Sequence, residues 1–235
     1  MNYSHWDLPV APVKLPACRN PTDVSNLKTV QMPWYQIIAW STLCICFVNC
    51  LFHFVRLIRL GSPVDYASPK GSISSGVAYS FTGAMNPVKK ESAFLHLPTY
   101  LAGILYHLGT FLSFILFFLF LLNFKIEGWL SYPIAGYLVI SGLAGVGIFL
   151  KRILKKELRS LSNPDDYLSN LLVTIFQILT MLIIFSQVFT PLYYMIVSLL
   201  LLYLPLGKLK HAIYFFAARY HLGFYFGRRG VWPPK

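Results

Sequence analysis

Five long apolar stretches constrain what this chain can fold into more than any other feature of its sequence. A helix that crosses the hydrocarbon core of a bilayer needs about 20 predominantly apolar residues. Stretches of that order occur at residues 34–58, 98–122, 129–150 and 167–186, and from 192 to 210 or beyond. Because only helices and closed barrels satisfy their backbone hydrogen bonds in lipid, the pattern predicts an all-α fold, an integral membrane bundle of five transmembrane helices.

The composition agrees with burial in lipid. Hydrophobic residues make up 56% of the chain and charged residues only 12%, whereas a soluble domain carries about 25% charged residues. Aromatic residues account for 17%, which is typical of helix packing in membranes and of the belts at the membrane–water interfaces. The excess of apolar side chains is therefore expected to face lipid.

The connections between the apolar stretches indicate how the helices neighbour one another. The segments 123–128 and 187–191 are short, so each is expected to join antiparallel neighbours. The segment 60–97 is too long for a mere linker, and we expect it to pack on a cytoplasmic partner. In the basic segment 151–166, the residues Ser162-Asn163-Pro164-Asp165-Asp166 combine a capping side chain, a first-turn proline and acids, which predicts a helix start.

Lysine and arginine are divided unevenly between the two faces of a five-helix bundle, with four on one face and sixteen on the other. The positive-inside rule makes the richer face, and with it the C-terminus, cytoplasmic. We therefore expect a multi-pass protein of the inner (cytoplasmic) membrane whose N-terminus lies outside. The four are Lys14, Arg19, Lys28 and Lys125, and the sixteen are Arg56, Arg59, Lys70, Lys89, Lys90, Lys151, Arg152, Lys155, Lys156, Arg159, Lys208, Lys210, Arg219, Arg228, Arg229 and Lys235.

This topology divides the chain into three parts and accounts for its charge. Residues 1–33 form an extracytoplasmic tail, 34–217 the transmembrane domain, and 218–235 a basic and aromatic cytoplasmic tail. A formal net charge of +12 would suggest nucleic acid in a soluble chain, but here the cations flank apolar stretches. We therefore expect membrane lipid, and no nucleic acid, as the partner of these charges.

Familiar catalytic motifs do not occur in the sequence. It contains no phosphate-binding glycine loop and no HExxH pair, and all eight acidic residues lie in loops or tails. The four cysteines, Cys18, Cys44, Cys46 and Cys50, match no zinc or iron–sulfur spacing. Proton transfer through buried carboxylates is therefore not expected, and histidine is the remaining source of chemistry.

Two histidines in the apolar stretches are the strongest candidates for a site. His107 follows Gly103 by four residues, and His211 follows Gly207 by four. Position i−4 lies on the same face of a helix, so each glycine would leave space beside an imidazole for a flat macrocycle. Ionisable groups at membrane depth are usually functional, and imidazole is a common axial heme ligand. A bis-histidine heme site is one interpretation; close helix packing at the glycines is the other.

Three segments also carry a resemblance to a known family. They are Leu105-Tyr106-His107-Leu108-Gly109, Asp166-Tyr167-Leu168-Ser169, and the stretch from Leu204 to His211. Between residues 92 and 220 the chain resembles the cytochrome b (gamma) subunit of respiratory nitrate reductase and its relatives in heterodisulfide-reductase-like membrane complexes. The resemblance implies an electron-transfer subunit, not catalytic alone, that connects the (mena)quinone pool to iron–sulfur and catalytic subunits at the cytoplasmic face.

The resemblance is incomplete at one of the two heme sites of that family. The family holds two hemes between its second and fifth helices, and this chain has the histidines of the cytoplasmic-side pair only, His107 and His211. Phe117 and Tyr193 stand where the resemblance places the second pair. We therefore expect one heme b, with His107 and His211 as the ligands of its iron. Whether quinone binds in this chain stays open, because the family's quinol site lies beside the other heme.

The remaining polar residues are weaker candidates. His53, His96 and Gln177 are candidate quinone contacts or secondary ligands, and each has an ordinary role in helix packing as its alternative. Four cations are candidates for binding heme propionates or a partner, with binding to anionic lipid as the alternative; they are Lys210, Arg219, Arg228 and Arg229. The rival function for the whole chain is a heme-free membrane anchor or assembly subunit.

Overall fold

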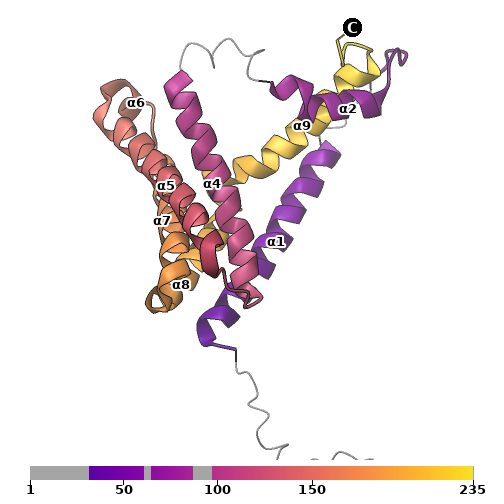
Figure 1. Ribbon diagram of the computed structural model, residues 1–235. Coiled ribbons are helices and arrows are strands. Elements are labelled where there is room, and N and C mark those ends of the chain that lie inside the picture. Colours follow the sequence, from indigo (N-terminus) through magenta and orange to yellow (C-terminus); the bar gives the residue numbers. More distant parts are fainter. Residues whose placement is uncertain (1–31, 61–64, 87–96, 235) are drawn as a thin grey trace, which may run out of the picture. The chain divides into compact units, whose positions relative to one another are not determined.

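The fold is entirely helical in the part of the chain that the structure describes. The computed structural model describes residues 32–60, 65–86 and 97–234, and every regular element in these ranges is a helix (Figure 1). This confirms the predicted fold class. The α-helices are α1 (Trp34–Leu60), α2 (Ile73–Phe81), α4 (Leu97–Leu121), α5 (Ser131–Leu154), α6 (Lys156–Ser160), α7 (Pro164–Phe185), α8 (Thr190–Tyr203) and α9 (His211–Arg228). Short 3₁₀ turns are η2 (Gly83–Met85), η4 (Gly128–Leu130), η5 (Gln187–Phe189) and η6 (Lys208–Lys210).

Four helices are each long and apolar enough to cross a bilayer. They are α1, α4, α7 and the continuous stretch Gly128–Leu154 formed by η4 and α5. The fifth expected helix is not a single rod, because α8 and α9 meet at a bend of 68° and qualify only together as one broken span. The break falls at Pro205, which has no backbone N–H to continue a helix, and at Gly207. Within the described residues, four helices are therefore long and apolar enough to cross a membrane, or five if the bent pair is one span.

The predicted start of the fourth helix is confirmed in detail. The Asn163 side chain accepts a hydrogen bond from the backbone N–H of Asp166 at 3.0 Å, and the Asp166 carboxylate accepts one from the backbone N–H of Asn163 at 3.1 Å. Pro164 occupies the first turn of α7, where the missing N–H costs nothing. The two reciprocal bonds fix the residue at which α7 begins and hold the Asp166 side chain in place.

Helices α4, α5 and α7 pack on one another through small residues (Figure 1). Gly109 lies so close to Ser141 that a Cβ would overlap the serine side chain, and Gly145 lies against Tyr106 and Thr174. Small residues let membrane helices approach closely where no hydrophobic force drives them together. The three helices are thus held at the short separation that their glycines permit.

A buried polar network also joins these three helices. The fully buried Gln177 amide donates to the Tyr106 carbonyl oxygen at 3.0 Å and to the Thr110 hydroxyl at 2.7 Å, and its oxygen accepts a bond from Ser141 Oγ at 2.8 Å. Satisfied polar networks specify one arrangement of a core. Gln177, a candidate quinone contact in the sequence, has its amide engaged by neighbouring helices.

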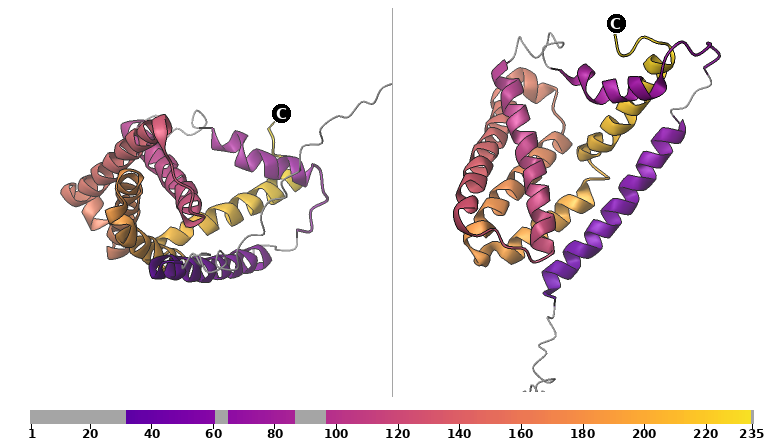
Figure 2. Two further views of the ribbon diagram at one scale, coloured as in Figure 1. Left: turned by 60° about the horizontal axis from the view of Figure 1, so that its bottom comes forward. Right: turned by 45° about the vertical axis from the view of Figure 1, so that its right-hand side comes forward.

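The broken span runs alongside α1 in the same direction. Near the start of both elements the Tyr35 ring stacks on Tyr194, with centroids 5.4 Å apart. Near their other ends His221 Nε2 lies 3.3 Å from the Leu57 carbonyl oxygen. Both helices of the pair pack on α1 (Figure 2). Helix α1 thus contacts both α8 and α9.

The described part of segment 60–97 packs on the chain itself. Helix α2 lies along α9 (Figure 2), and Gly76 meets Gly223 and Gly227 so closely that a Cβ at any of the three would overlap backbone atoms. Ser80 Oγ donates to the Arg219 carbonyl oxygen at 2.8 Å. Residue 217, the expected end of the transmembrane domain, lies inside α9. Helix α2, which belongs to the segment that we expect to pack on a cytoplasmic partner, packs on α9.

Candidate cofactor site

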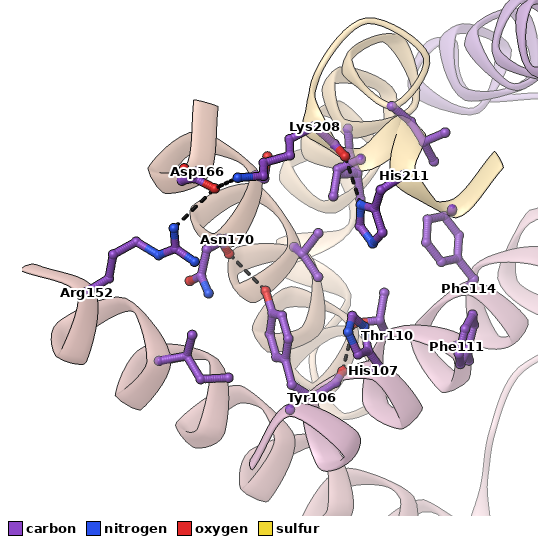
Figure 3. A pocket seen from close by; sticks show the side chains of 18 residues that line it. Tyr106, His107, Thr110, Phe111, Phe114, Arg152, Asp166, Asn170, Lys208 and His211 are labelled. Atoms are coloured by element: carbon purple, nitrogen blue, oxygen red, sulfur yellow. Dashed lines mark hydrogen bonds and ion pairs between the residues drawn. The ribbon is translucent and has the colours of Figure 1, made fainter. Parts of the chain in front are cut away.

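One cavity is bordered by three of the residues that the sequence singled out, Gly103, His107 and His211. Its volume is about 460 Å³, within the range of roughly 300–1,000 Å³ that is usual for small-molecule sites. Residues of α4, α5, α7, α8, η6 and the start of α9 line it (Figure 3). The lining residues are Gly103, Tyr106, His107, Thr110, Phe111, Phe114, Ile148, Arg152, Asp166, Ser169, Asn170, Val173, Leu200, Leu204, Lys208, Leu209, His211 and Ala212.

The two predicted axial histidines border the same cavity. His107 projects from α4 and His211 is the first residue of α9 (Figure 3). The Nδ1 atom of His211 lies 2.8 Å from the Lys208 carbonyl oxygen. Because that oxygen can only accept, Nδ1 carries the proton when the ring is neutral, and Nε2 keeps its lone pair. A ring held in this way is suited to bind iron through Nε2.

The two glycines differ in their surroundings. Gly103 lines the cavity, and no heavy atom outside its own turn lies within 4 Å of where its Cβ would be. Gly207 is not among the lining residues, because the Tyr203 ring fills the space beside it. The prediction for Gly207 requires an unbroken helix from Gly207 to His211, which would put both residues on one face. The break before His211 means that the two residues do not share a helix face in this way. The space expected beside an imidazole therefore exists on α4 only.

Three charged residues form one edge of the cavity, and the sequence does not predict that they meet there. The Asp166 carboxylate is buried and its Oδ1 atom pairs with Arg152 Nη1 at 3.1 Å and with Lys208 Nζ (Figure 3). Arg152 Nη1 also donates to Ser162 Oγ at 3.1 Å. A buried carboxylate requires cationic partners, but the sequence does not show the burial of Asp166; there the residue indicates a helix start and forms part of the resemblance.

The four cations proposed for propionates or a partner do not line this cavity. Lys210, Arg219, Arg228 and Arg229 are all absent from its walls. Arg229 Nη2 lies 3.3 Å from Asp65 Oδ1 and Arg228 Nε lies 3.9 Å from Asp65 Oδ2. The Arg229 hydrogen bond, helped by the Ala67 N–H, lowers the pKa of the Asp65 carboxyl below its ordinary value. Two of the four cations therefore tie the end of α9 to the segment before α2.

The other polar candidates lie away from the cavity or outside the described residues. His53 on α1 is not a lining residue, and its ring contacts Phe52 edge-on at 6.0 Å between centroids. Gln177 is enclosed by α4 and α5, as described above. His96 lies outside the described residues. His107 and His211 are thus the histidines, among the described residues, that border the cavity.

The positions where the resemblance places a second ligand pair are packed. Phe117 and Tyr193 are both 0% exposed. Around Tyr193 the rings of Phe120 and Phe176 lie at centroid distances of 6.2 Å and 6.0 Å, and Phe117 contacts Tyr194 at 6.5 Å. Aromatic side chains fill this region, so it offers no space for a macrocycle.

The residues of the cavity fit a heme b. A low-spin, six-coordinate heme b takes two axial ligands, and it is favoured by apolar walls around its ring and cations near its propionates. The cavity supplies two imidazoles, the side chains of Phe111, Phe114 and neighbouring aliphatic residues, and the charged edge at Arg152. No family model, no curated protein and no solved structure matches this chain. The resemblance to the nitrate reductase cytochrome b subunit therefore stays a prediction, and the function rests on the site.

Proposed function

We propose that this chain is a membrane cytochrome b subunit that binds one heme b through His107 and His211. It relays electrons between the (mena)quinone pool and an iron–sulfur subunit at the cytoplasmic face. The observation that carries the proposal is that two histidines, chosen from the sequence alone, border one cavity of suitable volume (Figure 3). As a subunit of an oxidoreductase complex the chain has no catalytic activity alone.

The chain's own residues bind, orient and enclose the group. His211 is held by the Lys208 carbonyl oxygen, which sets the direction of Nε2. The apolar side chains of α4, α7 and α8 keep water from the ring, and such burial together with the ligands determines the reduction potential. When bound, the heme supplies the one-electron chemistry.

Two further observations support one heme per chain and the proposed orientation. The packing at Phe117 and Tyr193 supports one heme per chain. The course of α8 and α9 beside α1 supports one broken span, and five crossings place the termini on opposite faces. With the sixteen-to-four division of cations, this favours an external N-terminus and a cytoplasmic C-terminus in the inner membrane.

The spectrum of the purified protein tests the heme assignment. We expect a low-spin b-type reduced-minus-oxidised spectrum and about one heme per chain by pyridine hemochrome analysis. His107→Ala and His211→Ala should each abolish the low-spin spectrum while the protein still inserts. His53→Ala is the matched control, since it removes a helical histidine outside the cavity. A folded wild-type protein without heme would instead favour the membrane-anchor function.

Reporter fusions test the orientation separately. A reporter after Lys235 should be active in the cytoplasm, and one inserted near Lys125 should be active outside. The reverse result would move the partner subunit to the opposite face and would contradict the proposed direction of docking, while leaving the heme assignment intact.

A further inference from the structure

The cavity is charged at one edge and mainly apolar elsewhere. Arg152 from α5 and Lys208 from η6 converge on the same oxygen of Asp166 from α7 (Figure 3). Three segments of the chain, α5, α7 and η6, therefore place two cations and one anion at the cavity wall. A ligand that matches this wall has an apolar body and an anionic group at its edge.

We propose that Arg152 and Lys208 bind one carboxylate of the ligand, which under the proposed function is a single heme propionate. The inference rests on the proposed heme and adds the residues and the orientation that the sequence did not provide. Arg152 and Lys208 take the role that the sequence suggests for the four cations near the C-terminus, since none of those four lines the cavity.

The two cations keep the capacity to bind a further carboxylate. Both described contacts of Arg152 use Nη1, whereas a guanidinium carries five N–H donors and an ammonium three. The Arg152 and Lys208 side chains are 32% and 53% exposed, against 5% for Asp166. Both side chains also line the cavity, so their remaining donors are available to a ligand while the carboxylate that they already hold is buried.

Charge limits the number of propionates at this edge to one. Two cations and Asp166 carry a net charge of +1, so one propionate makes the group neutral and a second would leave an unpaired negative charge. Unpaired charge in a partly buried position is costly. The second propionate is therefore directed away from Arg152 and Lys208.

Titration of the full-length protein, stripped of heme in detergent, with two forms of the cofactor tests the inference. Heme b carries free propionates, and its dimethyl ester has the same ring without their charge. Following the absorbance change on binding, we expect wild type to bind heme b at least about tenfold more tightly than the ester, because charge-assisted hydrogen bonds are lost. This comparison needs no variant and so does not depend on the folding of one.

Variants then assign the preference to the edge. Arg152→Gln and Lys208→Gln should each reduce the preference for heme b several-fold and leave ester binding unchanged, whereas Lys210→Gln, the control next to the cavity, should retain it. Asp166→Asn keeps an oxygen for the Asn163 N–H and removes the competing charge. It should therefore raise the affinity for heme b and not for the ester.

The outcomes separate this inference from the proposed function. Equal binding of heme b and ester to wild type, with a normal bis-histidine spectrum, overturns the inference and leaves the function standing. A preference that survives both Arg152→Gln and Lys208→Gln also overturns it and moves the propionate elsewhere. If neither compound binds with a low-spin spectrum, the proposed function and the inference fail together.

Discussion

The two halves of the segment 103–121 of α4 carry similar residues and lead to opposite results. In the first of these halves, Phe111 lines the cavity and is 63% exposed. Fewer than two turns later, Phe117 is 0% exposed within a cluster of rings from α7 and α8. The difference lies in the neighbours, because Gly103 and His107 leave space where the second half has large side chains on every side. The cavity therefore lies where the side chains of α4 leave space. Substitutions that enlarge or shorten side chains on this helix test its location.

The largest effect is expected from filling the open half. Gly103→Leu adds a branched side chain where no heavy atom outside the glycine's own turn lies within 4 Å of a Cβ, so the protein folds and the ligand is excluded. We expect loss of the low-spin spectrum, measured after reconstitution with heme b. Gly103→Ala is the control and should bind heme. Full heme binding with an unshifted spectrum in the leucine variant would show that the cavity beside Gly103 does not hold the macrocycle.

A large effect is also expected from emptying the filled half. Phe117→Ala leaves a void among buried rings and should lower the free energy of unfolding by about 3 kcal/mol. The matched change on the same helix, Phe111→Ala, should cost only about 0.5 kcal/mol because the side chain is exposed. Denaturant unfolding of both variants in detergent measures the two values. Equal losses would mean that the halves are packed alike.

A moderate effect is expected where two helices touch. A Cβ at Gly109 would overlap the Ser141 side chain, so Gly109→Ala forces α4 and α5 apart. We expect a loss of about 1–2 kcal/mol in the free energy of unfolding, with Gly103→Ala near zero as the partner variant. The same unfolding experiment compares them, and a neutral Gly109→Ala would show that this contact can adjust freely.

The smallest effect is expected away from both halves of α4, where an ion pair holds the end of α9. The folded-state pKa of Asp65 is lowered by its Arg229 hydrogen bond, so the stabilisation is complete above the unfolded value of about 4 and is lost as the pH falls through the lowered pKa. Hydrogen exchange near Arg229 should be unchanged from pH 7 to pH 5, after correction for intrinsic rates, and should rise in more acidic buffer.

The Asp65→Asn variant provides the control for this pH dependence. It should show the faster exchange already at pH 7 and lose the additional acid response. A transition in wild type between pH 7 and pH 5 would assign the effect to another group.

The sequence predicted the positions of the helices, which depend on residues close together in the chain. It did not predict the contacts between helices, which depend on tertiary packing. Apolar length located α1, α4, α5 and α7 to within a few residues, and the start of α7 at Pro164 could be read from a capping pattern. The bend near Pro205 was missed because the apolar stretch continues through it. The meeting of Arg152, Asp166 and Lys208 was missed because hydropathy and spacing contain no information on which distant segments converge.

The bend between α8 and α9 makes the orientation of His211 depend on the number of residues at the bend. Leu200, Leu204, Lys208 and His211 all border the cavity, and their spacing of four, four and three residues is that of one stripe on a straight helix. Here the helix is broken by a bend of 68° between α8 and α9, yet all four residues border the cavity. The number of residues from Leu204 to Lys208 therefore decides which face of α9 turns inward. One residue more or fewer would rotate His211 by about 100° about the helix axis, toward a neighbouring helix or lipid instead of the cavity.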